Sequence, residues 1–197
     1  MSVKAELRQY MLARRKALPP YELARRSTML RKHLFYYFSI AQWEWLHVFL
    51  PIPQQHEPDT WEIIRWIWEY DLPVKLAVPV VQPDGVSLRH HHLTPDTRLV
   101  TNRWGIPEPV EAPEVFPQQL DAVLIPLLAF DITGHRVGYG KGFYDRFLSE
   151  CRPDALRIGM SWEQPVPAIE DASPHDVRLH ACLTPMGIRW FGAEAWS

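Results

Sequence analysis

Residues 121–148 read DAVLIPLLAFDITGHRVGYGKGFYDRFL, which joins an apolar run, a turn, a glycine-rich loop and a charged amphipathic run. The apolar part, 121–130, predicts a buried strand, because strands covered on both faces are almost continuously hydrophobic. The residues FDITG favour a turn. The run after the glycines predicts a helix to about residue 149. Together they predict a strand–loop–helix unit of an α/β fold.

Helical patterns precede this unit. Apolar spacing predicts a helix that starts near residue 3 and ends before Pro19, and Pro20 suits the first turn of a second helix that ends near residue 38. These two form an N-terminal helical pair at about 3–38. A third helix is expected to run to about Tyr70, with Asp59 and Glu62 at the spacing of a capping box.

Short apolar runs bounded by proline or glycine predict the remaining strands, at 45–52, 74–81, 156–162, 180–185 and 187–192. Residues 86–93 are expected to form an edge strand or hairpin arm, and residues 101–109 a loop. Helices and strands alternate along most of the chain. The pattern therefore predicts an α/β fold, one layered domain over residues 1–197 with a mostly parallel central sheet flanked by helices.

The composition limits the class of protein. The chain has 197 residues, of which 47% are hydrophobic and 22% charged, as in ordinary globular domains. A formal net charge of −2 gives no overall attraction to nucleic acid or to an anionic membrane, so neither is expected as a partner. With two cysteines and no signal-peptide pattern, a reduced, cytoplasmic setting is expected. We expect a monomer.

The loop GYGKG places glycines at 138, 140 and 142 around Lys141. It is not a Walker A loop, because glycine follows the lysine, and it is not a Rossmann fingerprint, because Phe143 takes the place of the third glycine. The physical requirement is the same, however: bare backbone N–H groups and a following helix N-terminus favour an anion. Asp145, about one turn into that helix, can reach a metal ion beside phosphate.

Five blocks in order carry a resemblance. Residues 3–8 (VKAELR) with Arg14, 56–64 (HEPDTWEII), 102–109 (NRWGIPEP), 121–148 and 174–185 (PHDVRLHACLTP) resemble the segments of the 5-formyltetrahydrofolate cyclo-ligase family. The resemblance implies that family's sugar-phosphate-isomerase/CoA-transferase-like fold. It also implies conversion of 5-formyltetrahydrofolate, possibly polyglutamylated, with MgATP into 5,10-methenyltetrahydrofolate, ADP and phosphate.

The resemblance also implies roles for individual residues. Lys141, Arg136 and Tyr144 are expected to be catalytic, and Asp145 and Asp176 to hold Mg²⁺. The residues implied in ATP binding are Lys4, Arg8, Arg14, Arg136, Gly138, Tyr139, Gly140, Lys141, Gly142, Phe143, Tyr144 and Asp145. The residues implied in folate binding are Leu50, Glu57, Trp104 and Tyr144.

Two other functions stay open from the residues alone: a phosphate-binding isomerase that uses no nucleotide, and a non-catalytic module that binds nucleotide or folate. Three histidines, 90–92, invite a zinc site, but no acid or cysteine is near in sequence, so a solvated strand is expected. The basic clusters at 13–18 and 24–32 are expected to be helix exteriors. The tryptophans of the third helix are expected to pack in the core, and both cysteines to be unreactive.

Overall fold

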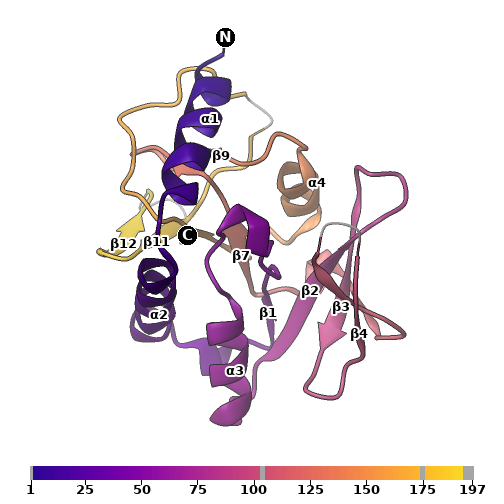
Figure 1. Cartoon of the computed structure of the whole chain (residues 1–197). Coiled ribbons are helices and arrows are strands. Elements are labelled where there is room, and N and C mark those ends of the chain that lie inside the picture. The colour runs from indigo at the N-terminus through magenta and orange to yellow at the C-terminus, as the bar shows by residue number, and fades with distance from the viewer. Residues whose placement is uncertain (1, 103–104, 174–175, 193–197) are drawn as a thin grey trace.

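One sheet organises the helices around it (Figure 1). Within residues 2–102, 105–173 and 176–192, which this computed structural model describes, the sheet has eight strands in the order β12-β11-β10-β7-β1-β2-β3-β6. The five inner strands from β11 to β2 are mutually parallel, whereas β12, β3 and β6 pair antiparallel at the two sides. The predicted α/β fold with a mostly parallel sheet is confirmed.

The strands of this sheet are β1 (Trp45–His47), β2 (Lys75–Val81), β3 (Leu88–Leu93), β6 (Glu114–Val115), β7 (Ala122–Pro126), β10 (Leu156–Met160), β11 (Ala181–Thr184) and β12 (Gly187–Trp190). Two ribbons join β4 (Leu99–Thr101) to β5 (Pro107–Pro109) and β8 (Ala129–Phe130) to β9 (Arg136–Val137). The α-helices are α1 (Val3–Lys16), α2 (Pro20–Tyr37), α3 (Trp61–Glu69) and α4 (Phe143–Glu150). Short 3-10 turns are η1 (Ile40–Gln42), η2 (Pro53–Gln55) and η3 (Pro117–Gln119).

The period of two along the strands divides the core between the faces of the sheet. Leu46, Leu76 and Leu124 pack on one face against α2 and α3, through residues such as Leu34 and Ile64. This face is the larger core. Because both faces are covered, the parallel strands are nearly all apolar, as the sequence indicated.

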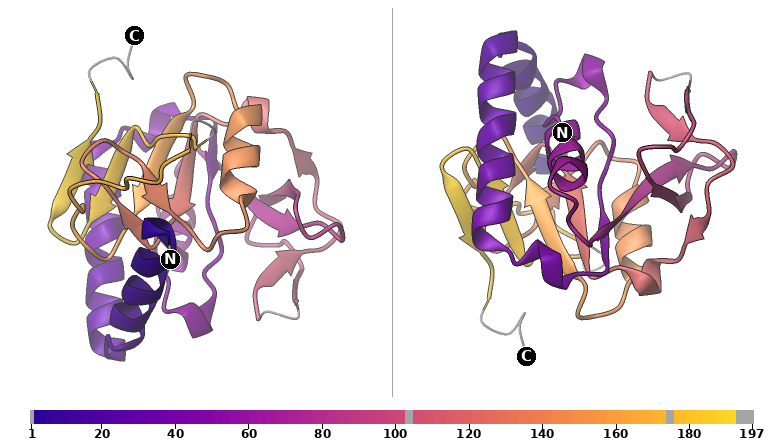
Figure 2. Two further views of the ribbon diagram at one scale, coloured as in Figure 1. Left: turned by 90° about the horizontal axis from the view of Figure 1, so that it is seen from above. Right: turned by 90° about the horizontal axis from the view of Figure 1, so that it is seen from below.

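The opposite face carries α4 (Figure 2). Val123 and Ile125 of β7 pack there with Phe147 and Leu148 of α4. A smaller cluster joins α1 to the β8–β9 ribbon through Met11. Among the described residues, no helix combines the length and the apolar character needed to cross a lipid bilayer.

Several local predictions are wrong. The strand expected at 45–52 ends as β1 at His47, although the chain stays buried to Leu50. Part of the loop expected at 101–109 pairs as the β4–β5 ribbon. The capping box does not form, because Thr60 is the N-cap of α3 and Glu62 instead forms an ion pair with Arg31 at 3.2 Å.

The expectation of a solvated histidine strand is also wrong. β3 is an interior strand between β2 and β6, and His90 is 2% exposed, with its ring stacked 4.0 Å from that of Phe147. His47 of β1 is fully buried beside it. Burial lowers the pKa of both imidazoles, that of His90 to about 4, so both are neutral in the fold at pH 7.

The buried histidines predict a pH-dependent stability. A group whose pKa is lowered in the fold stabilises above its unfolded pKa and loses that contribution as the pH falls toward the folded value. For His90 the window is about pH 6.5 to 4, and the free energy lost is about 3 kcal/mol. We expect His90→Leu to flatten the pH dependence of urea unfolding in this window. Equal slopes for variant and wild type would contradict this account.

Candidate active site

The site lies where the sheet changes its direction of growth. From β1 the chain crosses to β2 on one side, and it later returns to place β7 on the other side of β1. In open α/β sheets, ligands bind at the carboxyl ends of the strands that flank such a switch point. The segment after β1 carries Leu50 and Glu57, and the segment after β7 leads to the glycine loop. The topology therefore brings two distant stretches of sequence together.

Two of the three glycines in the loop adopt the left-handed backbone that glycine favours, whereas Gly138 does not. Gly140 and Gly142 adopt φ of 86° and 69°, in the left-handed region that disfavours side chains. A Cβ on Gly140 would lie 3.2 Å from the guanidinium of Arg8, and one on Gly142 would lie 2.9 Å from Arg146 Nη1. Gly142 is the N-cap of α4, whose first N–H groups take no side-chain cap. The loop thus presents bare backbone at a helix N-terminus, which suits an anion.

Cationic side chains surround this loop. Arg8 of α1 donates from Nε to the carbonyl oxygen of Gly138 at 2.9 Å. Arg136 of β9 is buried, donates to Asp145 Oδ1 at 2.7 Å and also donates to the Val177 carbonyl. Lys141 at the loop tip is exposed. The helix that opens the chain and the loop after β9 therefore supply positive charge to one place.

The two predicted metal ligands lie on adjoining segments. Asp145 Oδ1 accepts from the N–H of Val177 at 3.2 Å, and Asp176 is the residue before Val177. Asp176 Oδ2 pairs with Lys4 and accepts from Ser173 N at 2.7 Å. Burial alone would raise the pKa of Asp176, but the hydrogen bonds from Lys4 and Ser173 lower it overall. An ionised carboxylate is what a hard cation requires.

The glycine loop forms one wall of the site, and the second wall contains Glu57. Its side chain is 8% exposed, and its Oε2 accepts from the N–H of Ile52 at 2.7 Å. Its Oε1 accepts from the hydroxyl of Tyr139, also at 2.7 Å. Burial raises the pKa of Glu57, and the hydrogen bonds from Ile52 and Tyr139 and the charge of Arg15 oppose that rise. Leu50, the neighbouring apolar residue after β1, is buried.

Tyr144 lies between the two walls. Its hydroxyl is buried and, among the described residues, has no hydrogen-bond partner. Burial raises its pKa well above the ordinary value, and the nearby charge of Glu57 adds to the effect. Its ring meets those of His47 and Phe147. An unpaired buried hydroxyl is costly in a native structure and marks a position where a ligand group can bind.

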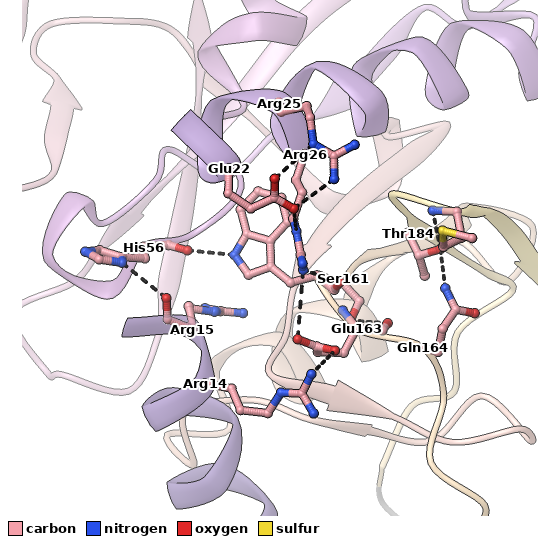
Figure 3. A network of polar contacts seen from close by, with 12 residues as sticks. Arg14, Arg15, Glu22, Arg25, Arg26, His56, Ser161, Glu163, Gln164 and Thr184 are labelled. Carbon is pink, nitrogen blue, oxygen red and sulfur yellow. Dashed lines mark hydrogen bonds and ion pairs between the residues drawn. The ribbon is translucent and has the colours of Figure 1, made fainter. Parts of the chain in front are cut away.

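The structure brings together most of the predicted site residues, but not all. Lys4, Arg8, Arg136, Asp145 and Asp176 form the contacts described above around the 138–142 loop. Arg14 instead donates to Glu163 at 3.0 Å, in a network that includes Arg26 (Figure 3). Trp104, to which the resemblance assigns a folate contact, lies outside the described residues, as does His175.

Arg15 was missed by the sequence analysis. Its basic cluster was expected to lie on a helix exterior, yet Arg15 is 4% exposed and donates to the hydroxyl of Tyr139 at 3.0 Å. Its carbonyl oxygen lies 3.2 Å from His56 Nδ1, so the end of α1 contacts the loop that carries Glu57 (Figure 3). The signal in the sequence was its position on the helix: Arg15 lies four residues after Met11, on the buried side of α1, whereas its neighbours Arg14 and Lys16 are exposed.

Comparisons with known proteins point to one family. The 5-formyltetrahydrofolate cyclo-ligase family matches residues 1–185. The 5-formyltetrahydrofolate cyclo-ligase of Escherichia coli (strain K12) is 34% identical over 179 residues, covering 87% of this chain and 94% of that protein. The mitochondrial 5-formyltetrahydrofolate cyclo-ligase of Arabidopsis thaliana is 32% identical over 157 residues, covering 68% of this chain and 56% of that longer protein.

Solved structures share the fold. The NMR structure of Aquifex aeolicus 5,10-methenyltetrahydrofolate synthetase superimposes with a TM-score of 0.76 at 26% identity, covering 95% of this chain and 92% of that one. The Mycoplasma pneumoniae 5,10-methenyltetrahydrofolate synthetase gives 0.70 at 21% identity, covering 91% and 97%, which is a likeness of fold. The family match over most of the sequence confirms the resemblance carried by the five motif blocks, and the chain belongs to the 5-formyltetrahydrofolate cyclo-ligase family.

Proposed function

We propose that this protein converts 5-formyltetrahydrofolate and ATP into 5,10-methenyltetrahydrofolate, ADP and phosphate. The observation that carries the proposal is the position of Tyr139. The backbone of Tyr139 lies inside the glycine loop, between Gly138 and Gly140, while its hydroxyl donates a hydrogen bond to the buried carboxylate of Glu57. A loop suited to phosphate and a carboxylate suited to the donors of a heterocycle are therefore in direct contact, as a phosphoryl transfer between two bound substrates requires.

The chemistry explains why ATP is needed. The formyl oxygen is amide-like and is a poor leaving group, whereas a phosphorylated oxygen leaves readily. The formyl oxygen attacks the γ-phosphorus and ADP departs, after which N10 adds to the activated carbon and inorganic phosphate is lost. The protein supplies mainly position and electrostatic stabilisation for such a transfer.

On the ATP side, the N–H groups of residues 138–142 and the N-terminus of α4 receive the phosphates, with Phe143 as the first residue of that helix. Arg8 is held at the loop by its bond to Gly138, and exposed Lys141 is free to follow the transferred group. Arg136, buried beside Asp145, adds a fixed charge. Lys4 and Arg14 remain further candidates, and in this structure both already pair with carboxylates.

Asp145 and Asp176 are suited to hold Mg²⁺. Among the contacts of the described residues, Oδ1 of Asp145 and Oδ2 of Asp176 take the hydrogen bonds, which leaves one oxygen of each carboxylate available. The described residues contain no group of three or more metal-ligating side chains. Two carboxylates suffice when the substrate phosphates and water complete the coordination, which is how Mg²⁺ is commonly bound. The ion, when bound, neutralises phosphate oxygens.

On the folate side, the Glu57 carboxylate accepts from the donor groups of the pterin. Leu50 gives an apolar surface, and Tyr144 supplies a ring and an unpaired hydroxyl. Trp104 remains a predicted contact. We further propose a monomeric cytoplasmic enzyme that takes folate with or without a polyglutamate tail. The free cysteines fit a reducing setting, and burial raises the pKa of Cys151 to about 12.

The activity itself is the first prediction. We expect absorbance of the methenyl product to grow when the purified protein receives 5-formyltetrahydrofolate with MgATP, and not when ATP is omitted. A phosphate-binding isomerase would not bind ATP in calorimetry. A non-catalytic module would bind ATP or folate without forming product. Absence of ATP-dependent product in the presence of both substrates would refute the proposed function.

Asp145→Asn tests the metal site. Loss of one charge in a partly dehydrated site weakens cation binding, so the Mg²⁺ concentration for half-maximal rate should rise and kcat should fall, each by about tenfold or more. Glu150→Gln, at the exposed C-terminal end of the same helix, is the control and should leave both unchanged. An unaltered Mg²⁺ titration for Asp145→Asn would place the metal elsewhere.

Glu57→Gln tests the folate wall. The amide keeps the shape but loses the charge, so the KM for 5-formyltetrahydrofolate should rise by about 10- to 100-fold while the KM for ATP changes little. Steady-state kinetics with each substrate varied in turn measures both. Equal changes in the two KM values would show that Glu57 does not serve the folate side selectively.

A further inference from the structure

Arg15 presents an unusual charge. It lies in the last turn of α1, is 4% exposed, and donates from Nη2 to the carbonyl oxygen of Leu127 at 2.6 Å and from Nη1 to the hydroxyl of Tyr139 at 3.0 Å. Neither partner is charged. Among the described residues, no carboxylate lies within ion-pair distance of its guanidinium. Burying a cation without a direct counter-ion costs folding free energy. This cost suggests that Arg15 serves a function through the residues it contacts.

The hydrogen atoms fix the direction of the chain of contacts. A guanidinium only donates, so the Tyr139 oxygen accepts from Arg15. The single proton of that hydroxyl is then directed to Glu57 Oε1, at 2.7 Å. Hydrogen bonds linked in this way polarise one another in a low-dielectric interior. The positive charge of Arg15 therefore polarises the Tyr139 hydroxyl and strengthens its hydrogen bond to Glu57.

We propose that Arg15 is a positioning residue for the folate substrate, acting through Tyr139 to orient the Glu57 carboxylate toward the donor edge of the pterin. The inference rests on the proposed function. Oε2 of Glu57 is held by the Ile52 N–H and Oε1 by Tyr139, so the plane of the carboxylate is fixed. Each oxygen keeps a further lone pair, and two parallel N–H donors, as on a pterin, match such a carboxylate.

The charge state of Glu57 depends on the same relay. The groups that lower the pKa of Glu57 are the Ile52 N–H, the Tyr139 hydroxyl and the Arg15 guanidinium. In turn, burial together with the charge of Glu57 raises the pKa of the Tyr144 phenol. His56 is its neighbour in sequence, with its ring turned to the Arg15 carbonyl. Burial raises the pKa of Glu57, whereas Tyr139 and Arg15 lower it. Without the relay, the carboxyl would protonate at a higher pH, and one of its oxygens would then donate a hydrogen bond and no longer match two N–H donors.

The relay also connects the two substrates. Tyr139 belongs to the glycine loop, so a change in the position of the loop would also move the phenol that restrains Glu57. The carbonyl of Arg15 and the ring of His56 make a second contact between α1 and the Glu57 loop. Arg8 of the same helix holds the glycine loop. One helix therefore positions both sides of the site.

The test measures kcat/KM for 5-formyltetrahydrofolate against pH, together with the KM for ATP, in Arg15→Met, Tyr139→Phe and the double variant. We expect each single variant to raise the folate KM about tenfold, to move the acidic limb of the profile upward by about one pH unit, and to change the ATP KM less than about twofold. The folate KM of the double variant should be no higher than that of the more impaired single variant, because both changes break the same relay.

Two further variants sharpen the result. Arg15→Lys keeps the charge and should restore part of the folate affinity, and Arg25→Met, on the exposed side of α2, should behave as wild type. An acidic limb that does not move in Tyr139→Phe, or additive losses in the double variant, would overturn the inference. If Arg15→Met does not fold, Tyr139→Phe decides alone. A wild-type protein without cyclo-ligase activity would instead refute the proposed function.

Discussion

The parallel pairing of β1 with β7, Leu46 opposite Ala122 and His47 opposite Val123, determines where both halves of the site begin. Each strand ends at the same edge of the sheet, and each is followed by a segment that leaves the sheet while still buried. One segment carries Glu57 and the other leads through β8 and β9 to the glycine loop. Helix α1 then covers both, with Arg8 at the loop and Arg15 behind Tyr139. The site is thus a consequence of strand order.

The two sides of the site differ in charge. On the phosphate side, cations outnumber acids, and two of the cations are already paired with Asp145 and Asp176. In the proposed function, Lys4 and Arg136 would exchange these internal pairs for pairs with the phosphates of ATP. On the proposed folate side, burial raises the pKa of the single buried carboxylate, Glu57, and hydrogen bonds from Ile52 and Tyr139 oppose that rise. Among the described residues, the hydrogen bond from the Tyr139 hydroxyl to Glu57 joins the two sides, so in the proposed function a loop residue influences the binding of the heterocycle.

The sequence predicted what periodicity and backbone chemistry control. The parallel core, the limits of α2 and the left-handed glycines at 140 and 142 follow from apolar runs, proline and the absence of Cβ atoms. It failed where contacts distant in sequence decide. Arg15 and Tyr139 are 124 residues apart, and no local pattern separates a buried arginine from its exposed neighbours. His90 was expected in solvent, but the rings of His47 from β1 and Phe147 from α4 pack against it and bury it.

In the proposed function, the glycine loop holds a triphosphate whose terminal group passes to the formyl oxygen of folate. Labelling that formyl oxygen with a heavy isotope tests it directly, by mass analysis of the inorganic phosphate formed in a single turnover. If the formyl oxygen is phosphorylated, each phosphate released with methenyl product carries one labelled oxygen. Unlabelled phosphate, with the label lost to water, would contradict it.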